Sequence, residues 1–278
     1  MPRKIITEEL KQEIIKYYLS QPMTMKQVED KYELSHPTMT KILKDVPKYT
    51  KAKLNNPNMK EHFFQEINEE AKAYFLGLLI SDGNVFKDNT GRQASISITL
   101  DLKDEYMLEK FKEVLQANTS VGHDSRGCGQ IAVRSNIMAE DLAKYGVVPR
   151  KSYNTYLPLI SKEMMPHLIR GIFDGDGCIY DLRGYPAISF SSSSEKMLNG
   201  LIKIFKEQVG VQLQTKDRQP KINGIQICYT CDNAMKILDW MYKSSVYLTR
   251  LDRKYNKYLS YVNKRYEKKK YTQDIKIV

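Results

Sequence analysis

The sequence predicts an α+β fold in which one αββαββα unit occurs twice, after a small all-α domain. Two observations predict the duplication. An apolar segment around a glycine ends in Asp-Gly at residues 75–83 and again at 169–177, and strands and helices follow both in the same order. The predicted strands come in neighbouring pairs without crossover helices, which excludes a doubly wound parallel sheet. We therefore expect antiparallel sheets with helices on one face.

The elements of each repeat follow from periodicity. Segments that alternate apolar and polar residues, as half-buried strands do, occur at 94–100 and 130–134 in the first repeat and at 187–191 and 225–229 in the second. Helical periodicity occurs at 107–115, 139–145, 197–207 and 234–240. The repeats are predicted to span residues 67–160 and 161–265.

The N-terminal residues 1–46 are predicted to form three short helices. Thr24 and Gln27 have the spacing of a capping box at the start of the second helix. The second and third helices, joined by a tight turn, resemble a helix-turn-helix, whose second helix lies in the major groove of DNA. The alternative is a small three-helix packing module without DNA contact. In the helix-turn-helix interpretation, the side chains that would face bases are His36, Thr38 and Lys41.

Two basic segments flank the repeats. Residues 47–66 contain proline, asparagine and several lysines, and are predicted to be a linker that is either a solvated tether or lies along phosphates. Residues 266–278 are predicted to be a basic tail.

The two apolar segments are predicted to be buried helices that pack on each other. Gly77 and Ser81 are four residues apart, as are Gly171 and Gly175, and small residues at this spacing let helix backbones touch. The packing would bring together Asp82 and Asp176, one at each C-terminal end. Because the helix dipole is negative there and two carboxylates repel, a divalent cation would relieve both costs.

These two segments resemble the paired motifs of the single-chain LAGLIDADG homing endonucleases. The second segment fits closely, whereas in the first Ile80 replaces an acid of the motif. The metal-binding acids of the family map onto Asp82 and Asp176, so the departure at Ile80 leaves catalysis intact. The resemblance implies a pseudo-twofold antiparallel β saddle in a monomer, with the backbone carbonyls of Ser81 and Gly175 as further metal ligands.

The resemblance also implies two basic residues near the scissile phosphates. Lys151 and Lys254 follow the last helix of each repeat and match that role. They would stabilise transition-state charge or polarise a water molecule. The alternative is that both are surface lysines that contact phosphate only. Two aspartates suit Mg²⁺, which prefers few carboxylates together with water and substrate oxygens.

The open faces of the predicted sheets carry side chains that read base edges or phosphates. The alternative is an ordinary solvated sheet face. The candidates in the first repeat are Ser97, Gln130 and Arg134. Those in the second repeat are Gln212, Gln214, Lys216, Arg218 and Gln226.

The composition agrees with a nucleic-acid partner. Lysine and arginine number 44 against 33 acidic residues, a net charge of +11, which favours double-stranded DNA first and an anionic membrane surface second. Without an apolar run of membrane-spanning length or a signal-peptide core, we expect a cytoplasmic protein with no membrane partner. Structural zinc is disfavoured, because only two of the four cysteines have the paired spacing of zinc ligands.

These observations favour a sequence-specific homing DNA endonuclease that makes a Mg²⁺-dependent double-strand break. Two alternatives remain on the same scaffold, a DNA-binding transcription regulator and an RNA maturase. A regulator is expected to have lost one of the two aspartates, and neither is lost. A basic saddle can serve either nucleic acid, so the sequence leaves the maturase open.

Overall fold

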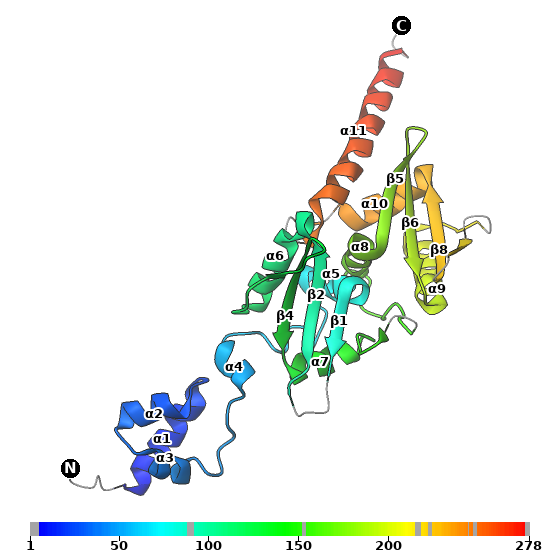
Figure 1. The fold of residues 1–278 in the computed structure, drawn as a ribbon. Helices are drawn as coiled ribbons and strands as arrows, with labels where there is room; N and C mark the ends of the chain where they lie inside the picture. The colour runs from blue at the N-terminus through cyan, green and yellow to red at the C-terminus, as the bar shows by residue number, and fades with distance from the viewer. Residues whose placement is uncertain are drawn as a thin grey trace. The chain divides into compact units, whose positions relative to one another are not determined.

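The computed structural model describes residues 6–87, 92–151, 154–214, 218–221, 224–243, 245–246 and 249–275. The chain forms two compact units. The smaller runs to Lys60 and includes residues 116–118, and the larger contains Glu61–Leu115 and the chain from Thr119 onwards. Figure 1 labels the elements of both.

The smaller unit contains the three predicted helices, α1 (Glu8–Ser20), α2 (Met25–Tyr32) and α3 (His36–Ile42), followed by a short helix, α4 (Lys51–Asn55). The capping box of α2 is present, with the Thr24 hydroxyl accepting from the Gln27 amide and the Gln27 side chain accepting from the Thr24 amide. Glu33 ends α2 in the left-handed conformation, with φ of 53°. The helices bury a small apolar core of Ile14, Tyr18, Met23, Val28, Tyr32, Met39 and Leu43.

The predicted linker of residues 47–66 is not extended chain throughout. Besides α4, its last residues belong to the larger unit, where Phe63 and Phe64 are buried. The ring centroid of Phe64 lies 6.5 Å from that of Phe111. The two aromatic side chains bury far more apolar surface in this core than a solvated tether would allow.

The larger unit contains the duplicated αββαββα order. The first repeat consists of α5 (Glu70–Asp82), β1 (Gly83–Phe86), β2 (Ser95–Asp101), a 3₁₀ turn (Leu102–Asp104), α6 (Tyr106–Leu115), β3 (Gly122–His123), β4 (Cys128–Arg134) and α7 (Asn136–Ala143). The second consists of α8 (Met165–Asp176), β5 (Gly177–Leu182), β6 (Tyr185–Ser192), α9 (Glu195–Ile204) with a π-helical turn (Phe205–Val209), β7 (Arg218–Lys221), β8 (Gly224–Thr230) and α10 (Cys231–Tyr242). A final helix, α11 (Asp252–Ile275), runs through the predicted boundary between repeat and tail.

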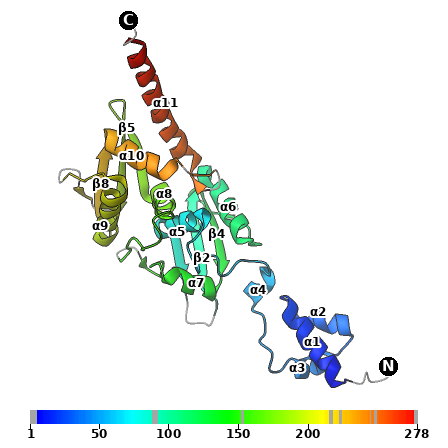
Figure 2. The same cartoon turned by 180° about the vertical axis from the view of Figure 1, so that it is seen from behind.

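Both sheets are antiparallel and have the same topology, which confirms the predicted fold class. Their strand orders are β1-β2-β4-β3 and β5-β6-β8-β7. Helices α5 and α8 lie side by side between the two sheets in both views (Figures 1 and 2). Alternation along β4 buries Ile131 and Val133 and exposes Gln130, Ala132 and Arg134, so one face of the sheet is open.

The close packing of α5 on α8 depends on two glycines. A Cβ atom at Gly77 would lie 2.1 Å from the Leu168 carbonyl oxygen, and one at Gly171 would lie 2.1 Å from the Tyr74 carbonyl oxygen. No side chain fits at either contact, because real Cβ atoms do not approach backbone atoms within 3 Å. The predicted backbone-to-backbone contact between these helices is therefore present.

Glycine is required directly after each of the two helices for steric reasons and not for a left-handed turn. Gly83 and Gly177 are extended, with φ of −84° and −83°, because each helix continues directly into a strand. A Cβ atom at Gly83 would lie 2.4 Å from the Leu79 carbonyl oxygen, and one at Gly177 would lie 2.1 Å from the Phe173 ring. Steric closeness rather than backbone conformation requires glycine here.

Among the helices that the structure describes, none is both long and apolar enough to cross a membrane.

Candidate active site

The site is built on the C-terminal ends of α5 and α8, where Asp82 and Asp176 are the last helical residues. A Cβ atom on Gly175 would lie 2.0 Å from the Ser81 hydroxyl oxygen and 2.5 Å from Asp82 Oδ2. The last turn of α5 is thus pressed against the residue before Asp176. The helix packing therefore brings the two aspartates into one site, as the sequence predicts.

Both aspartates are hard to ionise without a counter-charge. Burial, followed by the charge of Asp176, raises the pKa of Asp82 to about 6, against the lowering effect of Lys254 and Lys151. Burial also raises the pKa of Asp176, and the same two lysines oppose the shift. A carboxylate with a raised pKa binds a cation in competition with protons, so a metal would be held more tightly as pH rises.

Two buried lysines complete the site in matching positions. The Lys151 ammonium donates to the Gly83 carbonyl at 2.5 Å, and the Lys254 ammonium donates to the Gly177 carbonyl at 2.6 Å. Gly83 and Gly177 are equivalent residues at the junction of helix and strand. Lys151 is 8% exposed and Lys254 is 3% exposed, which contradicts the alternative that both are surface lysines.

The two lysines differ in how firmly they are held. Lys254 also donates to the carbonyls of Phe173 at 2.5 Å and Asp174 at 2.8 Å. A lysine ammonium has three donors, and these three carbonyls take all of them. Two of the carbonyls belong to the last turn of α8, where the Phe173 carbonyl also accepts from the Gly177 amide, so Lys254 caps the negative end of that helix dipole. Its charge acts on the site through space.

Burial lowers the pKa of both lysines. The pKa of Lys254 falls to about 8, with Asp174 opposing the shift, and that of Lys151 is lowered while Asp176 and Asp82 oppose it. Lys254 carries positive charge at neutral pH and lies close to its point of deprotonation. The site therefore combines two carboxylates that resist ionisation with two ammonium groups whose pKa is lowered by burial.

A cavity of about 520 Å³ opens beside Asp176 and Lys151. Hydroxyl groups at the end of β6 and in the segment before α8 face it, together with two isoleucines. The lining residues are Ile80, Ser81, Lys151, Thr155, Asp176, Ser191, Ser192, Ser193, Gly224 and Ile225. The space admits water and a phosphate group next to a carboxylate and an ammonium.

The donor set fits a hard cation with few protein ligands. No group of three or more His, Cys, Asp or Glu side chains able to hold a metal occurs among the described residues, so a metal here would rest on two carboxylates plus other oxygens. The carbonyls of Ser81 and Gly175 lie in the last turns of α5 and α8, where carbonyls have no intrahelical partner. Mg²⁺ accepts such a set, since it keeps several water molecules.

The predicted DNA-contacting residues of the first sheet differ in how far they are exposed on its open face. Arg134 and Gln130 are exposed, and the Gln130 amide donates to the Thr99 hydroxyl at 3.0 Å. Ser97 is only 8% exposed, because its short side chain lies in a central strand between Asn84 and Ala132 of the flanking strands. Ser97 lies on the open face, as predicted, but offers little surface there, and its contact with DNA stays a prediction.

Sequence reasoning missed the first strand of this sheet. Asn84 pairs with Ser97, and Phe86 pairs with Ser95 beside Arg134, so both lie on the open face. Phe86 is 59% exposed. The signal was the alternation of Gly83 to Phe86, which is too short to recognise directly after an apolar helix.

The predicted DNA-contacting residues of the second sheet do not all lie on its open face. Gln226 pairs with Ser191 on the open face, whereas Arg218 pairs with Ile227 on the opposite, helix-covered face. Arg218 donates to Glu195 at 3.2 Å and to Asn199 at 3.4 Å, both on α9, so the register contradicts its predicted place on the open face. Two further candidates, Gln212 and Gln214, are exposed in irregular chain before β7. Lys216 lies outside the described residues.

The three predicted base-facing residues of the smaller unit lie on α3. The His36 ring binds Glu29 of α2 at 2.6 Å, and the Thr38 hydroxyl shares a hydrogen bond with Ser35 at 2.9 Å. Lys41 is exposed. The helix order fits a helix-turn-helix, and DNA contact by this unit stays a prediction.

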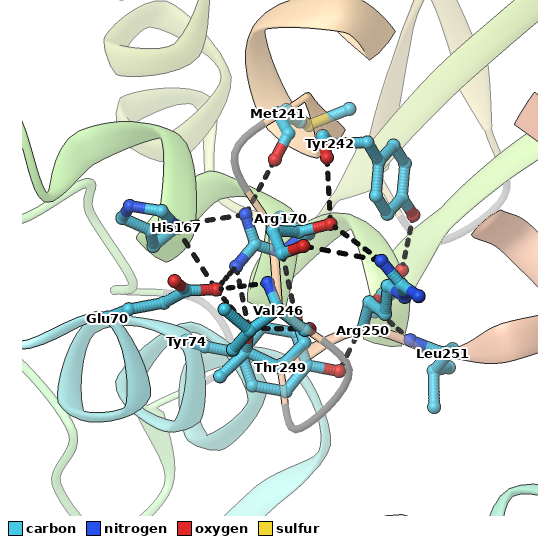
Figure 3. A network of polar contacts seen from close by, with 12 residues as sticks. Glu70, Tyr74, His167, Arg170, Met241, Tyr242, Val246, Thr249, Arg250 and Leu251 are labelled. Carbon is cyan, nitrogen blue, oxygen red and sulfur yellow. Dashed lines mark hydrogen bonds and ion pairs between the residues drawn. The ribbon is translucent and has the colours of Figure 1, made fainter.

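A buried polar network next to the site was also missed (Figure 3). Arg170 and Asp174 stand within the apolar motif of α8, and both are buried. The signal was present, since a motif of buried residues contains an arginine where its counterpart has Leu76 and an aspartate where its counterpart has Ile80. A buried charge requires partners, which the sequence does not identify.

Part of this chain is similar to a known protein family. Residues 163–272 match the family model of the LAGLIDADG-like domain. Among curated proteins, none matches the chain. A structure of the meganuclease I-AabMI bound to uncleaved DNA aligns with a TM-score of 0.49 and 13% identity, over 72% of this chain and 92% of that one.

Two structures of I-SmaMI align at 12% identity over 69% of this chain. One is bound to uncleaveable DNA with a TTCT central four, with a TM-score of 0.49 and 88% of that chain covered. The other is bound to an uncleaved DNA target in the presence of calcium ions, with a TM-score of 0.44 and 89% covered. The second αββαββα repeat, with its Asp176 and Lys254, lies within the matched family model. Residues 163–272 are therefore similar to a LAGLIDADG-like domain.

Proposed function

We propose that the protein is a sequence-specific homing DNA endonuclease that makes a metal-dependent double-strand break. The observation that carries the proposal is the meeting of Asp82 and Asp176 at the ends of two helices in backbone contact, each with a buried lysine beside it. Two equivalent acid–lysine pairs in one site suit a substrate with two equivalent strands. The LAGLIDADG-like domain over residues 163–272 supports the same proposal.

Each residue of the site has a separate role in phosphodiester hydrolysis. Asp82 and Asp176, with the carbonyls of Ser81 and Gly175, would hold Mg²⁺, which supplies an activated water molecule and positive charge at the phosphate when bound. Lys151 donates to one carbonyl of the described residues, and an ammonium with three donors can also bind a phosphate oxygen or the attacking water. Lys254 contributes its charge from behind the helix end, where it offsets the developing negative charge.

DNA binding would use the open sheet faces of a monomer with internal pseudo-twofold symmetry. Gln130, Arg134 and Gln226 are on these faces, and Asn84 and Phe86 join them. The smaller unit, as a helix-turn-helix, would add His36, Thr38 and Lys41 in a major groove. The net charge of +11 supplies the attraction to phosphates that such binding requires.

Incubation with a library of duplexes drawn from DNA that flanks its gene tests the proposal. With Mg²⁺ we expect a discrete cut at one sequence, and with chelator we expect binding without cutting. RNA of the same sequences tests the maturase alternative. Binding without cutting at any divalent metal would instead favour the transcription regulator.

Removal of residues 1–46 should weaken DNA binding and make its salt dependence shallower, while Mg²⁺-dependent cutting remains. Both aspartates and both lysines lie in the larger unit, whereas the three-helix core belongs to the smaller one. Single-turnover cleavage at saturating DNA, with binding measured at several salt concentrations, checks this. Loss of all cutting in a truncated protein that still unfolds cooperatively on heating would contradict it.

Lys151→Ala and Lys254→Ala should each slow cleavage by roughly 100-fold and weaken DNA binding far less, since a group that acts on the transition state lowers the rate without a matching loss of affinity. Rates at saturating DNA and equilibrium binding in chelator separate the two quantities. Lys257→Ala, an exposed position one turn further along α11, is the matched control. Equal losses of rate and affinity would make the lysines phosphate anchors.

The cleavage rate should rise with pH up to about 6 and decline above about 8. The raised pKa of Asp82 makes protons compete with the metal in acid, and the lowered pKa of Lys254 removes its charge in alkali. More Mg²⁺ should move the acid limb to lower pH and leave the alkaline limb in place, which a pH series at two metal concentrations checks. A rate that stays flat from pH 5 to 9 under single-turnover conditions would contradict both assignments.

A further inference from the structure

We propose that Asp174 and Arg170 are positioning residues for Lys254, and that Lys151 is held less firmly because α5 has apolar residues at the two corresponding positions. The proposal concerns the two buried charges of α8 that take no direct part in the chemistry. It rests on the proposed function for the readout in which each DNA strand is followed separately.

Asp174 fixes the start of the helix that carries Lys254. Its carboxylate accepts from the Leu251 amide at 2.8 Å, and Lys254 in turn donates its own amide to the Leu251 carbonyl at 3.1 Å. The same carboxylate accepts from the hydroxyls of Tyr74 at 3.0 Å and Tyr242 at 2.6 Å. One buried aspartate thus ties α5, α10 and the residue just before α11 to α8.

Arg170 fixes the chain just before that point. Its guanidinium is fully buried, and it donates to the carbonyl of Thr249 at 2.7 Å and to the Thr249 hydroxyl at 2.9 Å (Figure 3). It also donates to the Met241 carbonyl at the end of α10, at 2.6 Å. The Glu70 carboxylate, 2.7 Å away, balances its charge and accepts from the Thr249 hydroxyl and the Val246 amide.

These contacts bind the chain segment that leads to Lys254 at several residues. Thr249, Leu251 and Lys254 follow one another within six residues, and each is bound to α8. Because satisfied buried networks of this kind have one arrangement, they hold the attached segment in one place. The network therefore sets where the Lys254 charge lies.

Within the described residues of the first repeat, apolar side chains stand where this network has its two charges. Leu76 and Ile80 occupy the positions of Arg170 and Asp174 in α5, and both are buried apolar side chains. Before Lys151 the backbone of Arg150 is left-handed, with φ of 57°, a conformation that costs a non-glycine residue energy. Lys151 thus follows a strained residue, whereas Lys254 follows a segment bound at two places.

Asp174→Asn tests the proposal, because asparagine keeps the shape but presents an amide where the network needs an acceptor. Tyr242→Phe, which removes one donor to the same carboxylate, is the milder second variant. The control is a substitution of Ile131, a buried residue of the first sheet, chosen as Val or Ala to match the melting temperature of the test variant.

The first readout needs no cleavage activity. The DNA-free protein is pulsed with an amine-acylating reagent, and modification at Lys254 and Lys151 is measured by peptide mass spectrometry. We expect Asp174→Asn to raise the acylation rate of Lys254 several-fold and to leave that of Lys151 unchanged. Equal changes at the two lysines, no change at Lys254, or the same change in the Ile131 control would overturn the proposal.

The second readout is cleavage of a duplex whose strands carry different labels. We expect Asp174→Asn to slow cutting of one strand by about 100-fold, the effect of a displaced catalytic group, so that nicked DNA accumulates. Equal slowing of both strands would overturn the proposal. If the wild-type protein cuts no DNA, the proposed function fails and the acylation result alone decides the positioning role.

Discussion

Asp176→Asn is expected to slow cleavage by at least roughly 1,000-fold, the upper range for loss of one group that stabilises a transition state. The variant is also expected to stabilise the metal-free fold. Asparagine offers a weaker ligand and no negative charge, so Mg²⁺ loses one of two carboxylates and the attacking water loses its activation. Catalysis and stability therefore change in opposite directions.

The gain in stability follows from the sign of the pKa shift. The pKa of Asp176 is raised in the fold, so the native state holds the protonated form more tightly than the unfolded chain does. Stability is then lost as pH rises past the ordinary pKa of aspartate. Removal of the charge should recover on the order of 1 kcal/mol at neutral pH and nothing in strong acid.

Thermal melts in chelator at pH 3.5 and pH 7.5, beside a cleavage assay, measure both effects. We expect the variant to melt higher than wild type at pH 7.5 only, and to leave DNA intact. If Asp176 only made hydrogen bonds within the fold, the variant would melt lower with or without metal. A variant that melts lower in chelator and still cuts DNA would remove Asp176 from the site.

Gly77→Ala is expected to have the largest effect on stability, a loss of about 3 kcal/mol or more, because overpacking at a backbone contact forces the helices apart. The added Cβ would lie 2.1 Å from the Leu168 carbonyl oxygen and 2.9 Å from the Ile172 amide nitrogen. Backbone atoms cannot rotate away as a side chain can. Separation of α5 from α8 would also separate Asp82 from Asp176.

Urea unfolding of Gly77→Ala beside Gly122→Ala measures this effect. Gly122 has an ordinary φ, and the nearest atom to an added Cβ there is the Gln130 carbonyl oxygen at 3.9 Å. We expect the control to differ from wild type by less than about 1 kcal/mol. Equal unfolding midpoints for the two variants would mean that α5 and α8 are not in backbone contact.

The duplicated fold and the paired aspartates could be predicted because they leave local patterns in the sequence. Strands such as Ser95–Asp101 alternate, and the two glycine-centred helices repeat at a fixed distance. The four-residue spacing of Gly77 and Ser81, and of Gly171 and Gly175, also predicted the backbone contact. Periodicity and small-residue spacing are local properties, and these features depend on little else.

The features that were missed depend on partners distant in sequence. Arg218 was placed on the open face because alternation does not show where a short strand begins, and its register follows from β8. Ser97 is buried by its neighbours on two other strands. The partners of Asp174 come from residues 74, 242 and 251, which no local pattern connects.

The most direct test of the central claim is the mapping of both cut ends on a duplex selected from the library. We predict one cut on each strand, at fixed positions a few base pairs apart, that chelator abolishes and added Mg²⁺ restores. Two lysine–carboxylate pairs in one site require both cuts to come from one protein molecule, so the rate at saturating protein should be independent of protein concentration. A stable, sequence-specific complex that leaves both strands intact with Mg²⁺ or Mn²⁺ would contradict the account.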